Sequence, residues 1–239
     1  MNHHQRCLIN VFRDTLHSDE EPPSSVKYAG LLRDFTPTAK YNTHISVVNE
    51  DCLNETLKFS EGRVGLLNMA SDMSPGGGVK KGSRAQEEEI CRRTNLYKSL
   101  ASQAYPLGSL DIIYSPDIAV LKTVGYTRIP NAPRIDVLSM PALRRPALTR
   151  SGGYYEPAER IMSDKVRMLL QTAHYHGIDH LVLGAWGCGA FHNPPLQVAS
   201  LFKDRLRGEF AGVFKHVVFA ILEHDPQEPL GRAFKQVIL

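Results

Sequence analysis

The residues from Pro75 to Glu89, PGGGVKKGSRAQEEE, place three consecutive glycines shortly before a glutamine and three consecutive glutamates. Glycine adopts positive φ angles and lets backbone N–H groups approach a ligand closely, as binding of a diphosphate requires. An apolar stretch of strand length, 63–68, precedes the segment, so we expect the glycines where a strand ends in a loop. The segment is therefore the first candidate ligand site.

Two simpler interpretations of the glycines remain open. A Walker phosphate loop needs a lysine immediately before its serine or threonine, whereas 77–83 reads GGVKKGS, with both lysines ahead of the last glycine. A plain flexible turn is the other alternative. The carboxylates that follow favour a ligand loop over both.

A helix is predicted to begin at Gln86, because residues at spacings of three and four would form one side facing the core. These residues are Ile90, Thr94, Tyr97 and Ala101. The three glutamates, 87–89, would occupy the first turn, where acidic residues also favour the helix dipole, so simple capping is an alternative explanation. Successive helical side chains point about a third of a turn apart. We therefore expect one or two glutamates to turn toward the glycines.

A second glycine-rich loop, 184–195 (GAWGCGAFHNPP), leaves another apolar stretch and enters a predicted helix. Asn193 is a candidate N-cap, and the prolines after it suit a first helical turn. We expect a second anion-binding loop here, in which Phe191 either covers a sugar or base or packs beneath its own loop. Cys188 is interpreted as a small residue that permits close ligand approach, because no histidine and aspartate accompany it as they would accompany a nucleophile.

Three histidines, His174, His176 and His180, form the most conspicuous possible metal motif, HYHGIDH. They lie across a predicted helix end, a glycine turn and a strand start, so their side chains should diverge. We therefore predict no metal site and no cofactor.

The rest of the chain alternates short apolar stretches with longer amphipathic ones. The predicted strands are 44–48, 63–68, 111–115, 135–140, 180–185 and 216–222, and the clearest helices are 156–173 and 196–206. Nearly continuous apolar strands are typical of a sheet covered on both faces. The pattern predicts an α/β fold, a three-layer α/β/α sandwich with ligand loops at strand ends, preceded by an N-terminal helical extension over 1–43.

Composition excludes several classes of protein. A chain of 239 residues with 42% hydrophobic content can bury one sizeable core. The net charge of +3 comes from scattered basic residues, which argues against a duplex nucleic-acid or membrane-surface partner but is compatible with a small anionic ligand. The four cysteines form no C-x-x-C pair, and no apolar stretch is long enough to span a membrane, so we expect a cytosolic or nuclear protein.

The stretch Asn68–Leu100, NMASDMSPGGGVKKGSRAQEEEICRRTNLYKSL, closely resembles the signature of microbial-type poly(ADP-ribose) glycohydrolases, in which Gly-Gly-Gly and a short spacer precede Gln-Glu-Glu. The likeness extends over about 47–223, because VVNEDCLNETL, IIYSPDIAVLK and GAWGCGAFHNPP are similar to family segments in matching order. The resemblance implies a macrodomain-like sandwich around a mixed sheet for residues 44–239. It also implies ADP-ribose as the ligand and hydrolysis of the ribose–ribose O-glycosidic bonds of poly(ADP-ribose).

The same resemblance implies roles for individual residues. Glu88 would be the catalytic residue, Glu87 would orient the ribose at the cleaved bond, and Asn68 would contact that ribose. The other implied substrate contacts are Asp51 at the adenine, Gly76, Gly77 and Gly78 at the ribose and diphosphate, Gln86, and Gly187, Cys188, Gly189, Ala190 and Phe191 around the phosphates. One departure concerns 140–148, MPALRRPAL, which stands where an Ala-Pro-Asn-like stretch is expected and leaves that loop's contacts open.

Cleavage of a glycosidic bond requires protonation of the leaving oxygen and activation of water, which one glutamate can perform in turn. A helix N-terminus lowers a carboxyl pKa, so burial or the substrate must raise it if Glu88 is to carry a proton. Two other functions use similar binding chemistry: removal of single ADP-ribose units from protein or DNA, and non-catalytic binding of ADP-ribose. The expected partners are ADP-ribose, poly(ADP-ribose) and ADP-ribosylated macromolecules, without a membrane or sequence-specific nucleic acid.

Overall fold

A central sheet organises the structure, a computed structural model that describes residues 2–32, 35–223 and 229–239. Within these ranges seven strands form one mixed sheet in the order β1-β4-β5-β3-β6-β7-β2. The pairs β1 with β4 and β4 with β5 are antiparallel, and all other neighbours are parallel. The strands are β1 (Val26–Ala29), β2 (His44–Val48), β3 (Val64–Met69), β4 (Asp111–Ala119), β5 (Arg134–Met140), β6 (His180–Leu183) and β7 (His216–Ala220).

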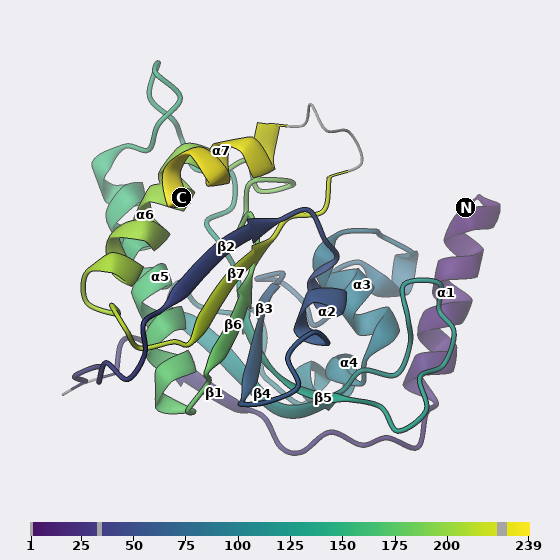
Figure 1. Cartoon of the computed structure of the whole chain (residues 1–239). Helices are drawn as coiled ribbons and strands as arrows, with labels where there is room; N and C mark the ends of the chain where they lie inside the picture. Colours follow the sequence, from purple (N-terminus) through teal and green to yellow (C-terminus); the bar gives the residue numbers. More distant parts are fainter. Residues whose placement is uncertain (1, 33–34, 224–228) are drawn as a thin grey trace.

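Helices cover both faces of the sheet, which gives the three layers seen in Figure 1. One layer holds α5 (Glu156–Tyr175), α6 (Pro195–Arg207) and α7 (Pro229–Ile238). The opposite layer holds α2 (Cys52–Thr56), α3 (Gln86–Arg93) and α4 (Leu96–Ala101), with the short 3₁₀ helix η1 (Val79–Lys81) beside them. Helix α1 (His3–Leu16) lies outside α3 as an outer support. The predicted α/β/α sandwich and its N-terminal helix are confirmed.

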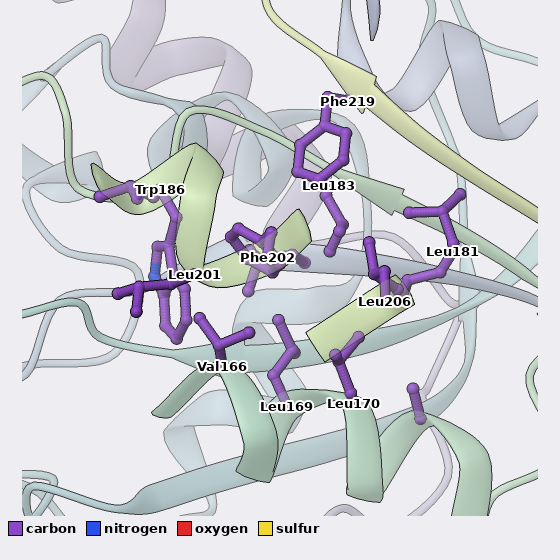
Figure 2. Packing of buried hydrophobic residues seen from close by; sticks show 14 of the residues in the cluster. Val166, Leu169, Leu170, Leu181, Leu183, Trp186, Leu201, Phe202, Leu206 and Phe219 are labelled. Carbon is purple, nitrogen blue, oxygen red and sulfur yellow. The ribbon is translucent and has the colours of Figure 1, made fainter. Parts of the chain in front are cut away.

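Alternating side chains of the central strands supply two hydrophobic cores, one on each face. On β3, Leu66 packs in the core beneath α2 and α3, and its neighbour Leu67 packs in the core beneath α5 and α6. Figure 2 shows the second core, where Phe202 of α6 lies among side chains of α5 and β6. Because both faces are buried, the strands read as the nearly continuous apolar stretches from which the layers were predicted.

Two local predictions were wrong or incomplete. The predicted helix from Gln86 ends at Arg93, because Thr94 is extended (φ −136°, ψ 167°) and pairs with Val120. Its hydroxyl also donates to the carbonyl of Ile90 and accepts from the N–H of Leu96, so one threonine separates α3 from α4. Strand β1 lies within the segment 1–43 for which only a helical extension was expected. The division of the chain at residue 43 stays a prediction, although β1 belongs to the main sheet.

Phe202 offers a test of the packing between α6 and the sheet. Its side chain is completely buried, so Phe202→Ala should lower the free energy of unfolding by about 3–5 kcal/mol through lost contacts and the cavity left behind. Leu196 lies on the same helix but is 49% exposed, and Leu196→Ala should change it by less than about 0.5 kcal/mol. Urea unfolding of both variants checks this, and equal effects would contradict the layer arrangement.

Candidate active site

The candidate active site lies at the carboxyl ends of the parallel strands, where the loops after β2, β3, β5, β6 and β7 meet. This is where ligands bind in open α/β sheets. A cavity of about 420 Å³ opens there. Its lining includes Asp51, Gln86, Gly187, Gly189, Ala190 and Phe191 from the predicted site, together with apolar side chains such as Leu53, Ile221, Leu222 and Leu230.

The glycine turn after β3 lies directly against the carboxylates of α3. Gly78 donates its N–H to Oε1 of Glu88 at 2.8 Å. Gly77 has φ +53°, and a Cβ atom at this position would lie 2.7 Å from Oε1 of Glu88 and 3.0 Å from Oε2 of Glu87. Glycine is therefore required at Gly77 both for its backbone conformation and for the space that the two carboxyl groups occupy.

Glu87 is almost fully buried, with 3% of its surface exposed. Its Oε2 accepts the N–H of Ser71 at 2.7 Å, and its Oε1 accepts from the amide of Asn68 at 3.3 Å. The same Asn68 amide nitrogen also donates to the hydroxyl of Ser139, so strands β3 and β5 fix its orientation. Burial raises the pKa of Glu87 to about 8, although the hydrogen bonds from Ser71 and Asn68 act in the opposite direction.

Glu88 presents the one carboxylate oxygen of the pair that is buried and unpaired among the described residues. Its Oε1 binds Gly78, whereas its Oε2 makes no hydrogen bond, and neither does Oδ1 of Asn68. Buried polar atoms nearly always have a partner, so unpaired ones call for an explanation. The simplest is that a bound molecule supplies it, and sugar hydroxyls are suitable donors.

Gln86 has a role that the sequence did not reveal. Its amide nitrogen donates to the carbonyl of Leu67 at 2.8 Å, and its amide oxygen accepts the N–H of Met69 at 2.8 Å. The side chain thus spans the end of β3 and locks the first turn of α3 onto that strand. It borders the cavity, but both ends of its amide are already used to position the following glutamates, and its contact with the substrate stays a prediction.

Asp51 is held by a buried ion pair. Its Oδ1 accepts the N–H of Asn54 at 2.9 Å, which caps α2, and also pairs with Arg93 at 2.8 Å. The guanidinium of Arg93 is fully buried and donates further to Asn54 and to the carbonyl of Lys122. Asp51 borders the cavity, and its contact with adenine stays a prediction. Arg93, which fastens the end of α3 to α2, was not foreseen from the sequence.

The second glycine-rich loop leaves several backbone N–H groups without a partner among the described residues. The N–H groups of Gly187, Gly189, Ala190 and Phe191 make no hydrogen bond to the described residues, whereas that of Cys188 binds the carbonyl of Ala185. Neighbouring free N–H groups in a turn form a concave site for phosphate oxygens. The N–H groups of 77 and 78 are already bonded within the protein. The loop after β6 is thus better suited than the glycine turn to hold a diphosphate.

The role of Asn193 in that loop differs from the expectation, and the pKa of Cys188 adds to it. Asn193 is not the N-cap of α6, which is Pro194. Instead, Asn193 accepts from the hydroxyl of Tyr154 and donates to the carbonyls of Leu143 and Gly187, so it ties the loops after β5 and β6 together. Burial raises the pKa of the Cys188 thiol to about 12, which is unfavourable for a nucleophile.

The three histidines considered as metal ligands lie apart. His174 packs edge-on against Phe35, and His176 stacks on Tyr114. His180 begins β6, at the end of the sheet opposite the cavity, and its ring stacks on Phe59. Within the described ranges, no three histidine, cysteine or acidic side chains are grouped to hold a metal ion. In the same ranges no helix has the length and apolar character needed to cross a membrane.

The sheet, its covering helices and the loops at the strand ends define a macrodomain-like α/β/α protein. The family model of the microbial-type PARG catalytic domain, where PARG is poly(ADP-ribose) glycohydrolase, matches residues 17–123, which contain the glycine turn and both glutamates. The chain is thus similar to microbial-type poly(ADP-ribose) glycohydrolases, in sequence over residues 17–123 and in fold over nearly its whole length.

Solved structures show the same similarity over nearly the whole chain. The Thermomonospora curvata poly(ADP-ribose) glycohydrolase bound to the inhibitor ADP-HPD is 28% identical, with a TM-score of 0.80 over 98% of this chain and 99% of that one. The Deinococcus radiodurans enzyme in complex with ADP-ribose is also 28% identical, with a TM-score of 0.76 over 98% and 91% of the two chains. Among curated protein sequences, none matches this chain.

The raised pKa of Glu87 has a measurable effect on stability. Between the ordinary value of 4.5 and about 8 the folded protein retains a proton that the unfolded chain has lost. The contribution of this group to the free energy of unfolding is therefore complete below pH 4.5 and is lost as the pH rises toward 8, by up to about 1.4 kcal/mol per pH unit. Glu87→Gln should remove this slope.

Urea unfolding between pH 5.5 and 7.5 measures the slope as the difference between wild type and variant. The exposed Glu61 provides the control, because Glu61→Gln removes a carboxyl group in water. A Glu87→Gln protein with the wild-type slope would show that Glu87 is ionised throughout this range.

Proposed function

We propose that the protein is a poly(ADP-ribose) glycohydrolase that cleaves the ribose–ribose O-glycosidic bond and releases ADP-ribose. The observation that carries the proposal is the buried pair Glu87 and Glu88 beneath the glycine turn, with Oε2 of Glu88 unpaired. A protein that only binds ADP-ribose has no need to bury two adjacent carboxyl groups, because their desolvation is costly. The pair is explained by catalysis.

The cavity and the loops beside it can accommodate the adenine, the diphosphate and the second ribose of ADP-ribose, in that order. Its volume of about 420 Å³ is in the range of small-molecule sites. Leu53, Ile221, Leu222 and Leu230 provide an apolar surface for adenine, and the free N–H groups of the loop 187–191 receive the diphosphate. The second ribose then reaches the end of β3, where Asn68 and Glu87 bind its hydroxyls and Glu88 faces the glycosidic bond.

The reaction needs a proton on the leaving oxygen and then a base for water. Glu87 and Glu88 lie against the same glycine, so the proton that burial retains on Glu87 at neutral pH lies close to Glu88. Glu88 delivers this proton to the departing ribose oxygen and afterwards, as a carboxylate, removes one from the attacking water. At Glu87, burial thus outweighs the effect of the helix N-terminus, which lowers a carboxyl pKa.

Glu88→Gln tests the assignment of the acid and base. The change keeps the shape of the side chain but removes proton transfer, so turnover of poly(ADP-ribose) should fall by about 10²- to 10⁴-fold. Affinity for ADP-ribose, measured by calorimetry, should stay within about threefold of wild type, which corresponds to less than 1 kcal/mol.

The assay follows release of free ADP-ribose from poly(ADP-ribose), from mono-ADP-ribosylated protein and from ADP-ribosylated DNA. Glu61→Gln is the control for loss of a negative charge. Wild-type turnover in the Glu88→Gln protein would refute the catalytic role, and release from the mono-modified substrates alone would identify a different hydrolase.

Gly77→Ala tests the close contact between the glycine turn and the carboxylates. An added Cβ meets both carboxyl groups, so it should displace Glu88 and lower turnover by about 10²-fold, as a misplacement of about 1 Å can do. Gly30 also has a positive φ (+84°), but a Cβ there meets no atom within 4 Å. Gly30→Ala therefore has the same backbone strain and should keep full activity. Equal activities of the two variants would mean that the glycines form only a turn.

A further inference from the structure

Arg144 connects two loops that come from different strands. It lies in the loop after β5, within the segment 140–148 that departs from the family pattern. Its Nε donates to Oδ1 of Asp72 at 3.2 Å, and its Nη2 contacts the same oxygen. The centre of its guanidinium lies 4.4 Å from the centroid of the Phe191 ring. One side chain thus contacts the loop after β3 and the loop after β6 at the same time.

Both partners of Arg144 are close to groups of the active site. Asp72 follows Ser71, whose N–H binds Glu87, and the backbone of Asp72 is fixed because its carbonyl accepts the N–H of Leu107 at 2.7 Å. Phe191 borders the cavity, in the loop with the free N–H groups. The contacts therefore form a continuous path from the ring of Phe191 to the carboxyl group of Glu87.

The backbone beside Arg144 strengthens this connection. The N–H of Arg145 donates to the carbonyl of Phe191 at 2.8 Å, so the loops after β5 and β6 are joined at the same point by main chain and side chain. A planar guanidinium can hold a carboxylate and stack on an aromatic face simultaneously, which an ammonium group cannot do equally well. The ring of Phe191 is consequently restrained on the face that Arg144 covers.

Global stability does not explain the arrangement. The side chain of Arg144 is 49% exposed and that of Asp72 is 28% exposed, and ion pairs so accessible to water contribute little to the free energy of unfolding. What the contacts do determine is the direction of the Phe191 ring relative to the loop that holds Glu87.

We propose that Arg144 is a positioning residue for the hydrolysis reaction, which it assists by holding Phe191 in place beside the ribose whose glycosidic bond Glu88 helps to cleave. This inference rests on the proposed function. Arg144 acts through Phe191 and Asp72 and makes no contact with the reacting atoms. The segment 140–148, which departs from the stretch that the family resemblance leads us to expect, thereby contributes Arg144 as a support for Phe191.

The test compares Arg144→Gln with Arg145→Gln. The side chain of Arg145 makes no hydrogen bond or ion pair with the described residues, so the two variants remove the same charge from neighbouring positions and only one breaks the contacts. Arg144→Gln should lower kcat on poly(ADP-ribose) about tenfold, within the ~10²-fold that a misplacement of about 1 Å can cause. The KM, the affinity for ADP-ribose and the melting temperature should stay close to wild type, and Arg145→Gln should behave as wild type.

A double-mutant cycle with Asp72→Asn tests whether the two residues act together. The double variant should lose no more activity than Arg144→Gln alone, and Arg144→Lys should recover part of the activity because it restores the ion pair without the stacking.

Four results would overturn the proposal. Equal losses of kcat in Arg144→Gln and Arg145→Gln would indicate that the arginines only attract the polyanionic substrate. A fall in kcat accompanied by equal falls in melting temperature and in affinity for ADP-ribose would indicate a structural role. If the wild-type protein binds ADP-ribose but releases none from the polymer, the proposed function fails and the positioning role fails with it. If the wild-type protein cleaves the polymer and Arg144→Gln has the same kcat as wild type, the positioning role alone is refuted.

Discussion

Burial of two adjacent carboxyl groups at the start of α3 is the constraint around which the site is built. Taking such groups out of water is costly, and each needs partners or a proton. The protein supplies N–H groups from Ser71 and Gly78, the amide of Asn68, and a proton retained on Glu87. The cost left over is concentrated on Oε2 of Glu88, the one carboxylate oxygen of the pair without a partner among the described residues.

The surrounding elements hold this helix turn from every side. Gln86 fastens it to β3, and Arg93 fastens its far end to α2. Outside, Phe12 of α1 packs edge-on against Tyr97, with ring centroids 5.0 Å apart. The two glycine-rich loops have different roles. The glycine turn after β3 accommodates the carboxylates, and the loop after β6 has N–H groups that are available to phosphates. In the proposed reaction, catalysis and binding are therefore carried by separate loops that meet at one edge of the sheet.

The sequence predicted those features of the fold that depend on the spacing of residues close together in the chain. The strands, the first turn of α3 and the two loops follow from apolar periodicity and glycine positions, and the resemblance to a family selected Glu87 and Glu88. Features that depend on distant partners were missed: the pairing of β1 with β4, the extended Thr94 opposite Val120, and the contacts of Arg144 with Asp72 and Phe191. Nothing in the local sequence of 140–148 distinguishes Arg144 from Arg145, because only the folded loops decide which one has partners.

The central claim is that one ligand spans both loops and brings its second ribose to Glu88. A crystal structure of the Glu88→Gln protein with ADP-ribose measures this directly. We expect the diphosphate to accept hydrogen bonds from the N–H groups of Gly189 and Phe191, and the anomeric carbon of the second ribose to lie about 3–3.5 Å from the side-chain amide at position 88, the separation of reacting groups. A ribose that points away from this side chain, with the diphosphate on the glycine turn, would contradict the account.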